Sequence, residues 1–151
     1  MSYNALTIIS YQFLELNTIQ LYEILQLRSE VFVVEQDCVY QDVDGKDNKA
    51  IHVLGYINDK LVAYTRIFKP GAYFEESSIG RVVVRSSYRG KSYGQDIMMA
   101  SIAFAKAEKY SSIKISAQCY LDKFYNNLGF ISTGEKYLED GIPHQAMILE
   151  F

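Results

Sequence analysis

A glycine-bearing turn between a predicted strand and a predicted helix is the stretch of this sequence best suited to chemistry. It runs Arg89-Gly90-Lys91-Ser92-Tyr93-Gly94. Backbone N–H groups at the start of a helix lack partners and lie at the positive end of the helix dipole, so they can bind phosphate. Arg89 and Lys91 would add positive charge. The motif is short, and two interpretations stay open: an anion site, or glycines that serve only the geometry of the turn.

The same turn ends like a P-loop. Gly90-Lys91-Ser92 fits the last three positions of GxxxxGK[ST], but the first glycine of that motif would fall on Arg85. Arginine lacks the backbone freedom with which glycine lets such a loop curl around phosphate. Binding of a nucleoside triphosphate is therefore the weaker alternative.

An acidic stretch from Asp42 to Asp47 is similar to a calcium-binding loop. With Gly45 at the sixth loop position, Tyr40 takes the first position and Ile51 the twelfth, where carboxylates are required. The pattern therefore excludes calcium. We expect a solvated acidic turn, with attraction of a cationic partner as the weaker interpretation.

Length and composition are those of a single ordinary globular domain covering residues 1–151. The net charge is -3 and the basic residues are scattered, so we expect no nucleic-acid partner. No apolar run approaches the ~20 residues that span a bilayer, and the N-terminus does not have the pattern of a signal peptide. The distant Cys38 and Cys119 fit a reducing, cytoplasmic compartment. With only two histidines besides, no metal site is expected.

The predicted elements form a mixed α+β order rather than a repeating βα pattern. Asn58-Asp59 favours a tight hairpin, and Gly129 favours the end of a short helix. Thr18 is a candidate N-cap for the first helix. Strands are predicted over residues 5–10, 51–57, 61–68, 78–85, 113–119, 130–136 and 146–151, and helices over residues 18–32, 95–109 and 121–128.

Two segments resemble signatures of the GNAT acetyltransferase family. Arg89 and Gly94 match its pyrophosphate-binding pattern [QR]-x-x-G-x-[GA], with Ser92 in place of the first motif glycine. Phe124-Tyr125-x-x-Leu128-Gly129-Phe130 resembles the segment that carries a catalytic tyrosine in many members. Residues 27–36, 42–45, 79–82 and 137–144 are also similar to signatures of the ElaA-like branch. The resemblance extends from about residue 21 to residue 147.

The resemblance implies a single-domain GNAT fold with a mostly antiparallel sheet and a splayed strand pair that holds the cosubstrate acetyl-CoA. Backbone groups of Val82, Val83 and Val84 would bind the pantetheine, and the turn from Arg89 to Gly94 the pyrophosphate. The N–H of Val82 would stabilise the oxyanion formed when an amine attacks the thioester. Tyr125 would protonate the departing thiolate, unless it only packs its ring and bonds locally.

The implied acceptor is a primary amine, on a small molecule or a peptide, and it must lose a proton. With a pKa of about 10.4, only about one alkylamine in a few thousand is neutral at pH 7, which costs about 4.6 kcal/mol. The candidate bases are Glu35, His144 and His52, which the sequence does not rank. The candidate residues of the acceptor pocket are Arg28, Phe32, His52 and Arg81.

Arg28 falls on the otherwise apolar stripe of the first helix, and Glu35 returns to nearly the same azimuth if the helix reaches it. A charge that faces a core needs a partner. Either Arg28 forms a buried ion pair or bonds to loop carbonyls, or it lines the acceptor pocket together with Glu35.

Two rival functions stay open. Arg28, Phe32 and Glu35 are also similar to residues of acyl-homoserine-lactone synthases, which use a longer acyl donor, although those enzymes carry an N-terminal tryptophan and this chain has none. The second rival is a non-catalytic acyl-CoA-binding module. Analogy with the family suggests a homodimer.

Overall fold

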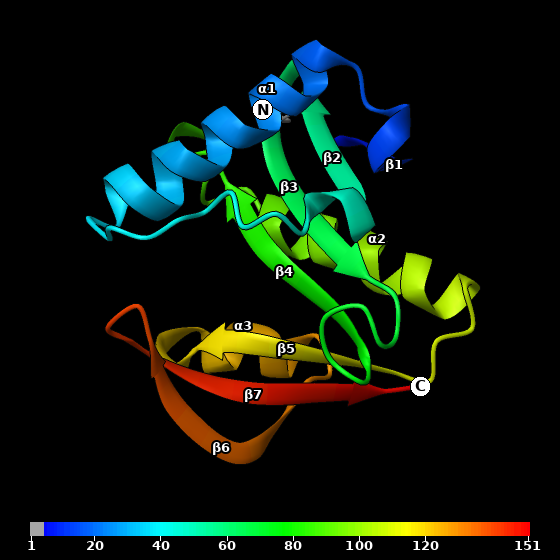
Figure 1. Ribbon diagram of the computed structural model, residues 1–151, viewed down its shortest axis with the longest axis vertical. Coiled ribbons are helices and arrows are strands. Elements are labelled where there is room, and N and C mark those ends of the chain that lie inside the picture. Colours follow the sequence, from blue (N-terminus) through cyan, green and yellow to red (C-terminus); the bar gives the residue numbers. More distant parts are fainter. Residues whose placement is uncertain (1–4) are drawn as a thin grey trace.

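The protein is built on a β-sheet of seven strands, which the computed structural model describes for residues 5–151 (Figure 1). The strands follow the order β1-β2-β3-β4-β5-β7-β6, and neighbours pair antiparallel except β4 with β5. The predicted α+β class is thereby confirmed. The strands are β1 Thr7–Gln12, β2 Ile51–Ile57, β3 Lys60–Phe68, β4 Ser77–Val84, β5 Ser112–Gln118, β6 Ile131–Glu139 and β7 Ile142–Glu150.

Helices cover both faces of the sheet. The helices are α1 Thr18–Arg28, α2 Tyr93–Ala107 and α3 Asp122–Asn127. In Figure 1, α1 crosses one face of β3 and β4, and α2 and α3 lie behind the sheet. One apolar core forms between α1 and the sheet around Ile24 and Leu27, and the other forms beneath α2 around Ile97 and Met98. Because β2 and β3 are covered on both faces, their sequences are nearly continuous apolar runs.

The first helix differs from its prediction at both ends. Its N-cap is Asn17, not Thr18: the Asn17 side chain accepts a hydrogen bond from the N–H of Gln20 at 2.8 Å, and the Gln20 side chain accepts one from the N–H of Asn17. After Arg28 the chain continues as a π-helix, Ser29–Glu35. A π-helix has more residues per turn than an α-helix, so a spacing of seven does not return Glu35 to the azimuth of Arg28.

Turn chemistry sets the hairpins much as predicted. Asn58 and Asp59 connect β2 to β3 with φ angles of 48° and 67°. Asp140 and Gly141 also have positive φ and connect β6 directly to β7, which therefore begins at Ile142, earlier than predicted. Cys119 lies beyond β5 in a 3₁₀ turn, so the strand begins and ends one residue earlier than predicted.

Strands β4 and β5 pair over only two residues before they diverge. Their register joins Ser77 to Ile113 and Ser78 to Lys114. Beyond this point β4 contains a bulge, in which Arg81 and Val82 oppose the single residue Thr65 of β3, and Arg81 has a φ of 50°. The parallel pair therefore opens toward the carboxyl ends of its strands. Within residues 5–151, no helix is long and apolar enough to cross a membrane.

Candidate active site

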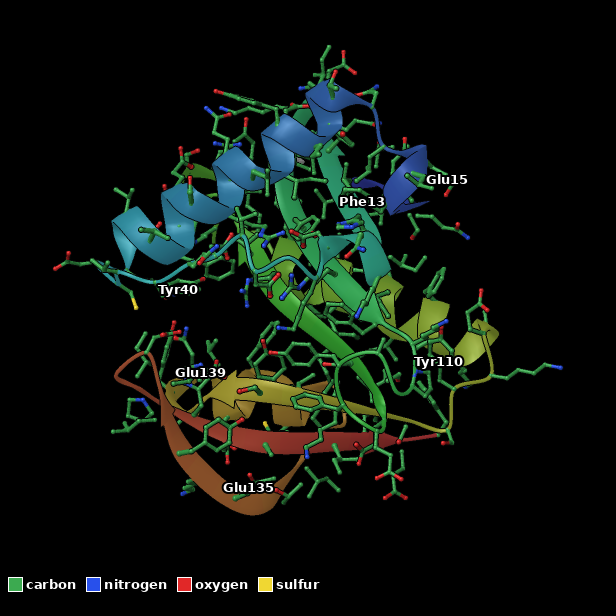
Figure 2. The ribbon with its side chains drawn as sticks, in the orientation of Figure 1. Phe13, Glu15, Tyr40, Tyr110, Glu135 and Glu139 are labelled. Atoms are coloured by element: carbon green, nitrogen blue, oxygen red, sulfur yellow. The ribbon has the colours of Figure 1, made fainter. Side chains whose placement is uncertain are left out.

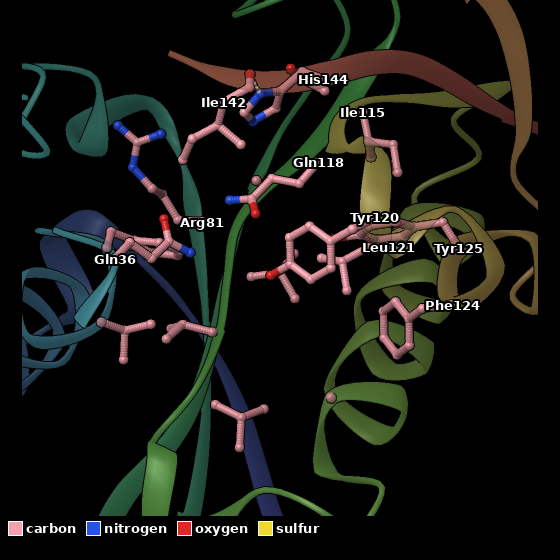
Figure 3. Close-up of a pocket in the computed structure, with 18 of the residues that line it drawn as sticks. Gln36, Arg81, Ile115, Gln118, Tyr120, Leu121, Phe124, Tyr125, Ile142 and His144 are labelled. Carbon is pink, nitrogen blue, oxygen red and sulfur yellow. Dashed lines mark hydrogen bonds between the residues drawn. The ribbon is translucent and has the colours of Figure 1, made fainter. Parts of the chain in front are cut away.

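The divergence of β4 and β5 opens a pocket of about 590 Å³ that runs through the sheet. Figure 3 shows Gln36 and Arg81 on one side of it, with Tyr120, Leu121, Phe124 and Tyr125 on the other. His144 and Ile142 close one end. The pocket is large enough for a small-molecule ligand and combines apolar walls with a few polar side chains.

The predicted anion-binding turn also lines the pocket. Helix α2 begins at Tyr93 after Ser92, which is left-handed with a φ of 63° and caps no backbone N–H with its side chain. Gly90, with a φ of 79°, would have no atom within 4 Å of an added Cβ. The backbone can therefore come close to an anion at the positive end of the α2 dipole.

Ser92 stands at the position of the first motif glycine. It adopts the left-handed conformation, which is open to serine at a modest cost. Lys91 lies apart from the other turn residues. It does not line the pocket, and its Nζ lies 5.6 Å from the centre of the Tyr88 ring. Arg89, Gly90, Ser92, Tyr93 and Gly94 all line the pocket.

Glu35 is bound to the turn. Its carboxylate accepts hydrogen bonds from both terminal nitrogens of Arg89, and one of these, from Nη2 to Oε1, measures 3.0 Å. Arg89 Nε also donates to the carbonyl of Val84 at 3.0 Å. The π-helix thus brings Glu35 and Phe32 to the pocket wall, with Glu35 already engaged by a guanidinium.

Strand β4 supplies the pocket with backbone groups. Val82, Val83 and Val84 line it beside the bulge, on the edge that faces away from β3 once β5 has diverged. Exposed strand groups of this kind can pair with the amide groups of an extended ligand, as they would with another strand.

Tyr125 lines the pocket from α3 and is 7% exposed. Its ring packs edge-on against Phe124 and Phe130, with centroids 5.0 and 6.0 Å away. Burial raises the pKa of Tyr125 to about 12, and proximity to Tyr120 adds to the effect. The phenol therefore stays protonated at neutral pH and can donate a proton.

His144 lines the pocket from β7, and its side chain is 8% exposed. The Nδ1 atom lies 2.7 Å from the carbonyl oxygen of Ile142. Because a carbonyl only accepts, Nδ1 carries the hydrogen and Nε2 is the basic nitrogen of the neutral ring. Nε2 in turn lies 3.3 Å from Oε2 of Glu139.

Arg28 and His52 lie outside the pocket, which corrects the expectation that they line it. Arg28 is fully buried and donates to Asp42 at 2.8 Å and to Asp47 at 2.7 Å. His52 bridges the hydroxyl of Tyr64 and the carbonyl of Asp47. Of the two roles considered for Arg28, the buried ion pair is the one the structure shows.

The acidic stretch is a buried charge cluster rather than a solvated turn. We define the cluster as three arginines and three aspartates, with ion-pair distances from 2.6 to 3.4 Å. Arg81 joins it to the pocket, because it lines the pocket and also contacts Asp42 at 2.7 Å. The carboxylates are thereby neutralised. The members are Arg28, Arg66, Arg81, Asp42, Asp44 and Asp47.

Several residues of this region escaped sequence reasoning. Arg66 was not recognised as a member of an ion pair. It lies in an otherwise apolar strand, and an arginine on a buried strand is itself a signal of a buried ion pair. Gln118 and Tyr120 line the pocket, and no spacing in the sequence singles them out. Glu139 lines it too, and it was noted only as part of the signature over residues 137–144. Within residues 5–151, the histidine, cysteine and acidic side chains form no group of three that could hold a metal ion.

The pKa values of Asp44, Asp47 and the neighbouring His52 make the stability of the fold depend on pH. Burial alone would raise the pKa of Asp47, but Arg28 and Arg66 outweigh burial and hold that pKa below its ordinary value. The pKa of Asp44 is lowered in the same way, mainly by Arg66. Burial lowers the pKa of His52, so this imidazole stays neutral in the folded protein.

We therefore expect stability to fall in two steps as the pH is lowered. Below about pH 6.5 the unfolded chain binds a proton at His52 that the folded state resists, and below about pH 4 the same applies to Asp44 and Asp47. Urea unfolding near pH 7.5, 5.5 and 3.5 measures both steps. A free energy of unfolding that does not change over this range would contradict the assignment.

Comparisons with known proteins agree with this geometry. Residues 16–151 match the family described as "Acetyltransferase (GNAT) domain". Protein ElaA of Escherichia coli K12 is 45% identical over 139 residues, covering 90% of this chain and 91% of ElaA. The crystal structure of E. coli ElaA superposes with a TM-score of 0.89 at 42% identity, over 97% of this chain and 100% of that one.

Two further crystal structures share the fold. An acyl-CoA N-acyltransferase from Pseudomonas aeruginosa has a TM-score of 0.91 at 37% identity, over 96% of this chain and 99% of that one. A GNAT family acetyltransferase from Elizabethkingia anophelis with acetyl-CoA bound has a TM-score of 0.66 at 15% identity, over 97% and 98%, and shows likeness of fold alone. The matched family, the ElaA similarity and the splayed-strand pocket lead to one conclusion: this chain belongs to the GNAT acetyltransferase family and is an acyltransferase.

Proposed function

We propose that this protein transfers an acetyl group from acetyl-CoA to the nitrogen of a primary amine. The observation that carries the proposal is the layout of the pocket. An uncapped helix N-terminus suited to pyrophosphate lines the pocket, a proton donor lies on its side wall, and a proton acceptor closes one end. The edge of β4 that β5 has left also lines the pocket, with the Val84 carbonyl already bonded to Arg89.

The residues of the pocket fit acetyl-CoA. The N–H groups around Gly90, Ser92 and Gly94 would hold the pyrophosphate, and Arg89, whose charge Glu35 offsets, would add to them on leaving that carboxylate. Val82, Val83 and Val84 would pair with the pantetheine amides. When bound, acetyl-CoA supplies an acetyl thioester, and its transfer breaks the C–S bond, forms an N–C bond and leaves a thiolate to be protonated.

Tyr125 and a backbone N–H group would act on the thioester. Tyr125 would donate its phenolic proton to the sulfur. The phenol is protonated at neutral pH, but burial, which raises its pKa to about 12, makes it a weaker acid, so the transfer would depend on the negative charge that develops on the sulfur. The backbone N–H of Val82 would donate a hydrogen bond to the thioester carbonyl and favour attack at its carbon. Burial around Tyr125 would also exclude water, against which the thioester must be protected.

Among the three candidate bases, we favour His144. Glu35 is engaged by Arg89, and His52 lies outside the pocket beneath Asp47. His144 lines the pocket and keeps Nε2 as the basic nitrogen. Phe32 and Arg81 would form the wall beside the acceptor, with Arg81 held by the buried charge cluster.

Calorimetric titration with acetyl-CoA, longer acyl-CoAs and Mg-ATP in parallel tests the donor. We expect micromolar binding of acetyl-CoA and none of Mg-ATP, followed by amine-dependent thiol release. Preference for a longer acyl-CoA would support the rival donor, for which Phe32 and the apolar pocket wall leave room. Acetyl-CoA binding without turnover on any amine would support the non-catalytic module, and no binding of any acyl-CoA would contradict the proposal.

A further inference from the structure

His144 has an acceptor oxygen next to each ring nitrogen. Nδ1 lies 2.7 Å from the carbonyl of Ile142, and Nε2 lies 3.3 Å from Oε2 of Glu139. In the neutral ring only one nitrogen carries a hydrogen, and the contact with the carbonyl places that hydrogen on Nδ1. The lone pair of Nε2 therefore faces a carboxylate. A proton on Nε2 would turn this pair of acceptors into a charge-assisted hydrogen bond.

Glu139 is itself held in place by neighbouring strands. The hydroxyl of Ser116 on β5 donates to Oε1 of Glu139 at 3.4 Å, and the hydroxyl of Tyr137 donates to Ser116 at 2.6 Å. The ring of Tyr137 stacks on His144 with the centroids 6.2 Å apart and the planes 16° apart. The cross-strand register opposes Tyr137 to His144, so the sheet fixes the whole arrangement.

Glu139 also lies where an acceptor can reach it. Together with Ser116 it lines both the main pocket and an adjoining pocket of about 190 Å³, which is walled by Tyr73, Phe74 and Tyr137. The Glu139 side chain is 46% exposed and the His144 side chain 8%. The carboxylate therefore lies where the two pockets meet, and His144 lines the main pocket beside it.

We propose that Glu139 positions His144 and relays the acceptor's proton to it, an inference that rests on the proposed function. The amine nitrogen releases a proton to the Glu139 carboxylate, which passes it to the facing Nε2, and this yields a neutral amine and an imidazolium. The imidazolium then donates from Nδ1 to Ile142 and from Nε2 to Glu139, so both of its N–H groups have acceptors. Glu139 is a carboxylate again after the transfer, orients the ring and stabilises the protonated form.

Other charged and titratable groups near His144 either bond elsewhere or lie in the turn beyond Glu139. Tyr137 on β6 donates to Ser116, and Asp140 lies in the β6–β7 turn. On the facing wall, Arg81 pairs with Asp42, and the hydroxyl of Tyr40 donates to the same carboxylate at 3.0 Å. The adjacent strand β5 opposes Gln118, which does not titrate, to His144. Glu139 is therefore the charged group best placed to respond to protonation of Nε2.

The first experiment follows the two histidine ring signals by NMR as the pH is varied, with His144→Gln to assign them. We expect Glu139→Gln to lower the titration midpoint of His144 relative to the wild type, because the carboxylate that stabilises the imidazolium is gone. Glu135→Gln is the matched control, since Glu135 lies farther along β6 from the turn (Figure 2) and lines only the smaller pocket. An unchanged midpoint in Glu139→Gln would overturn the proposal.

The second experiment measures amine-dependent thiol release against pH. We expect Glu139→Gln to lower kcat about 10- to 100-fold and to shift the acid limb of the profile, with unchanged affinity for acetyl-CoA and an unchanged melting temperature. Equal kcat and equal pH profiles in both proteins would overturn the inference. Absence of wild-type turnover on any amine would contradict the proposed function instead, and the NMR comparison would then decide the role of Glu139.

Discussion

Tyr125→Phe is expected to lower kcat by about 100-fold or more while the affinity for acetyl-CoA stays within about twofold of the wild type. General acid catalysis of this kind contributes roughly 10²- to 10⁴-fold. The substitution removes the proton donor but keeps the ring, which packs against Phe124 and Phe130. The rate of thiol release at saturating substrate gives kcat, and calorimetry gives the dissociation constant of acetyl-CoA.

Tyr120→Phe is the control for this result. Tyr120 also lines the pocket, but its side chain is on the surface, with 75% of the residue exposed. We expect its substitution to leave kcat nearly unchanged. A large loss in Tyr120→Phe with none in Tyr125→Phe would transfer the proton-donor role to Tyr120. Equal activity in both variants and the wild type would leave the thiolate without a protein donor, contrary to the proposed mechanism.

Asp47→Asn is expected to lower the free energy of unfolding by about 3 kcal/mol, the cost of removing one partner from a buried ion pair. One oxygen of Asp47 lies 2.7 Å from Arg28 and 2.9 Å from Arg66, so the neutral amide weakens two buried pairs at once. The side chain keeps its size, which excludes a cavity as the cause. Urea unfolding followed by circular dichroism near pH 7.5 measures the loss.

The matched control is Asp59→Asn in the β2–β3 turn. Asp59 is exposed and has a φ of 67°, a conformation that asparagine also adopts readily. Its substitution should change the unfolding free energy by less than about 0.5 kcal/mol. If Asp47→Asn unfolds at the same urea concentration as this control and the wild type, the buried charge cluster does not stabilise the fold.

The sequence by itself determined the local features of this protein. The α+β class, the β2–β3 hairpin at Asn58-Asp59 and the turn before α2 were all predicted, because each depends on residues close together in the chain. Anion binding at that turn stays a prediction. The resemblance to the GNAT family was carried by the same kind of local motif, and it is confirmed over residues 16–151. The end of β5 and the start of β7 were displaced by one to four residues, as is usual for element boundaries.

The tertiary structure alone decided which charges meet. Arg28 and Glu35 were expected on one helical stripe, but the π-helix turned Glu35 toward Arg89, 54 residues away, and the acidic loop supplied the partners of Arg28. A charged residue on a buried face indicates that a partner is needed, but any carboxylate that the fold brings near can be that partner. Partner choice depends on contacts between distant segments, and so does the setting of His144 beside Glu139. Local patterns in the sequence do not encode such contacts, because the packing of the whole sheet creates them.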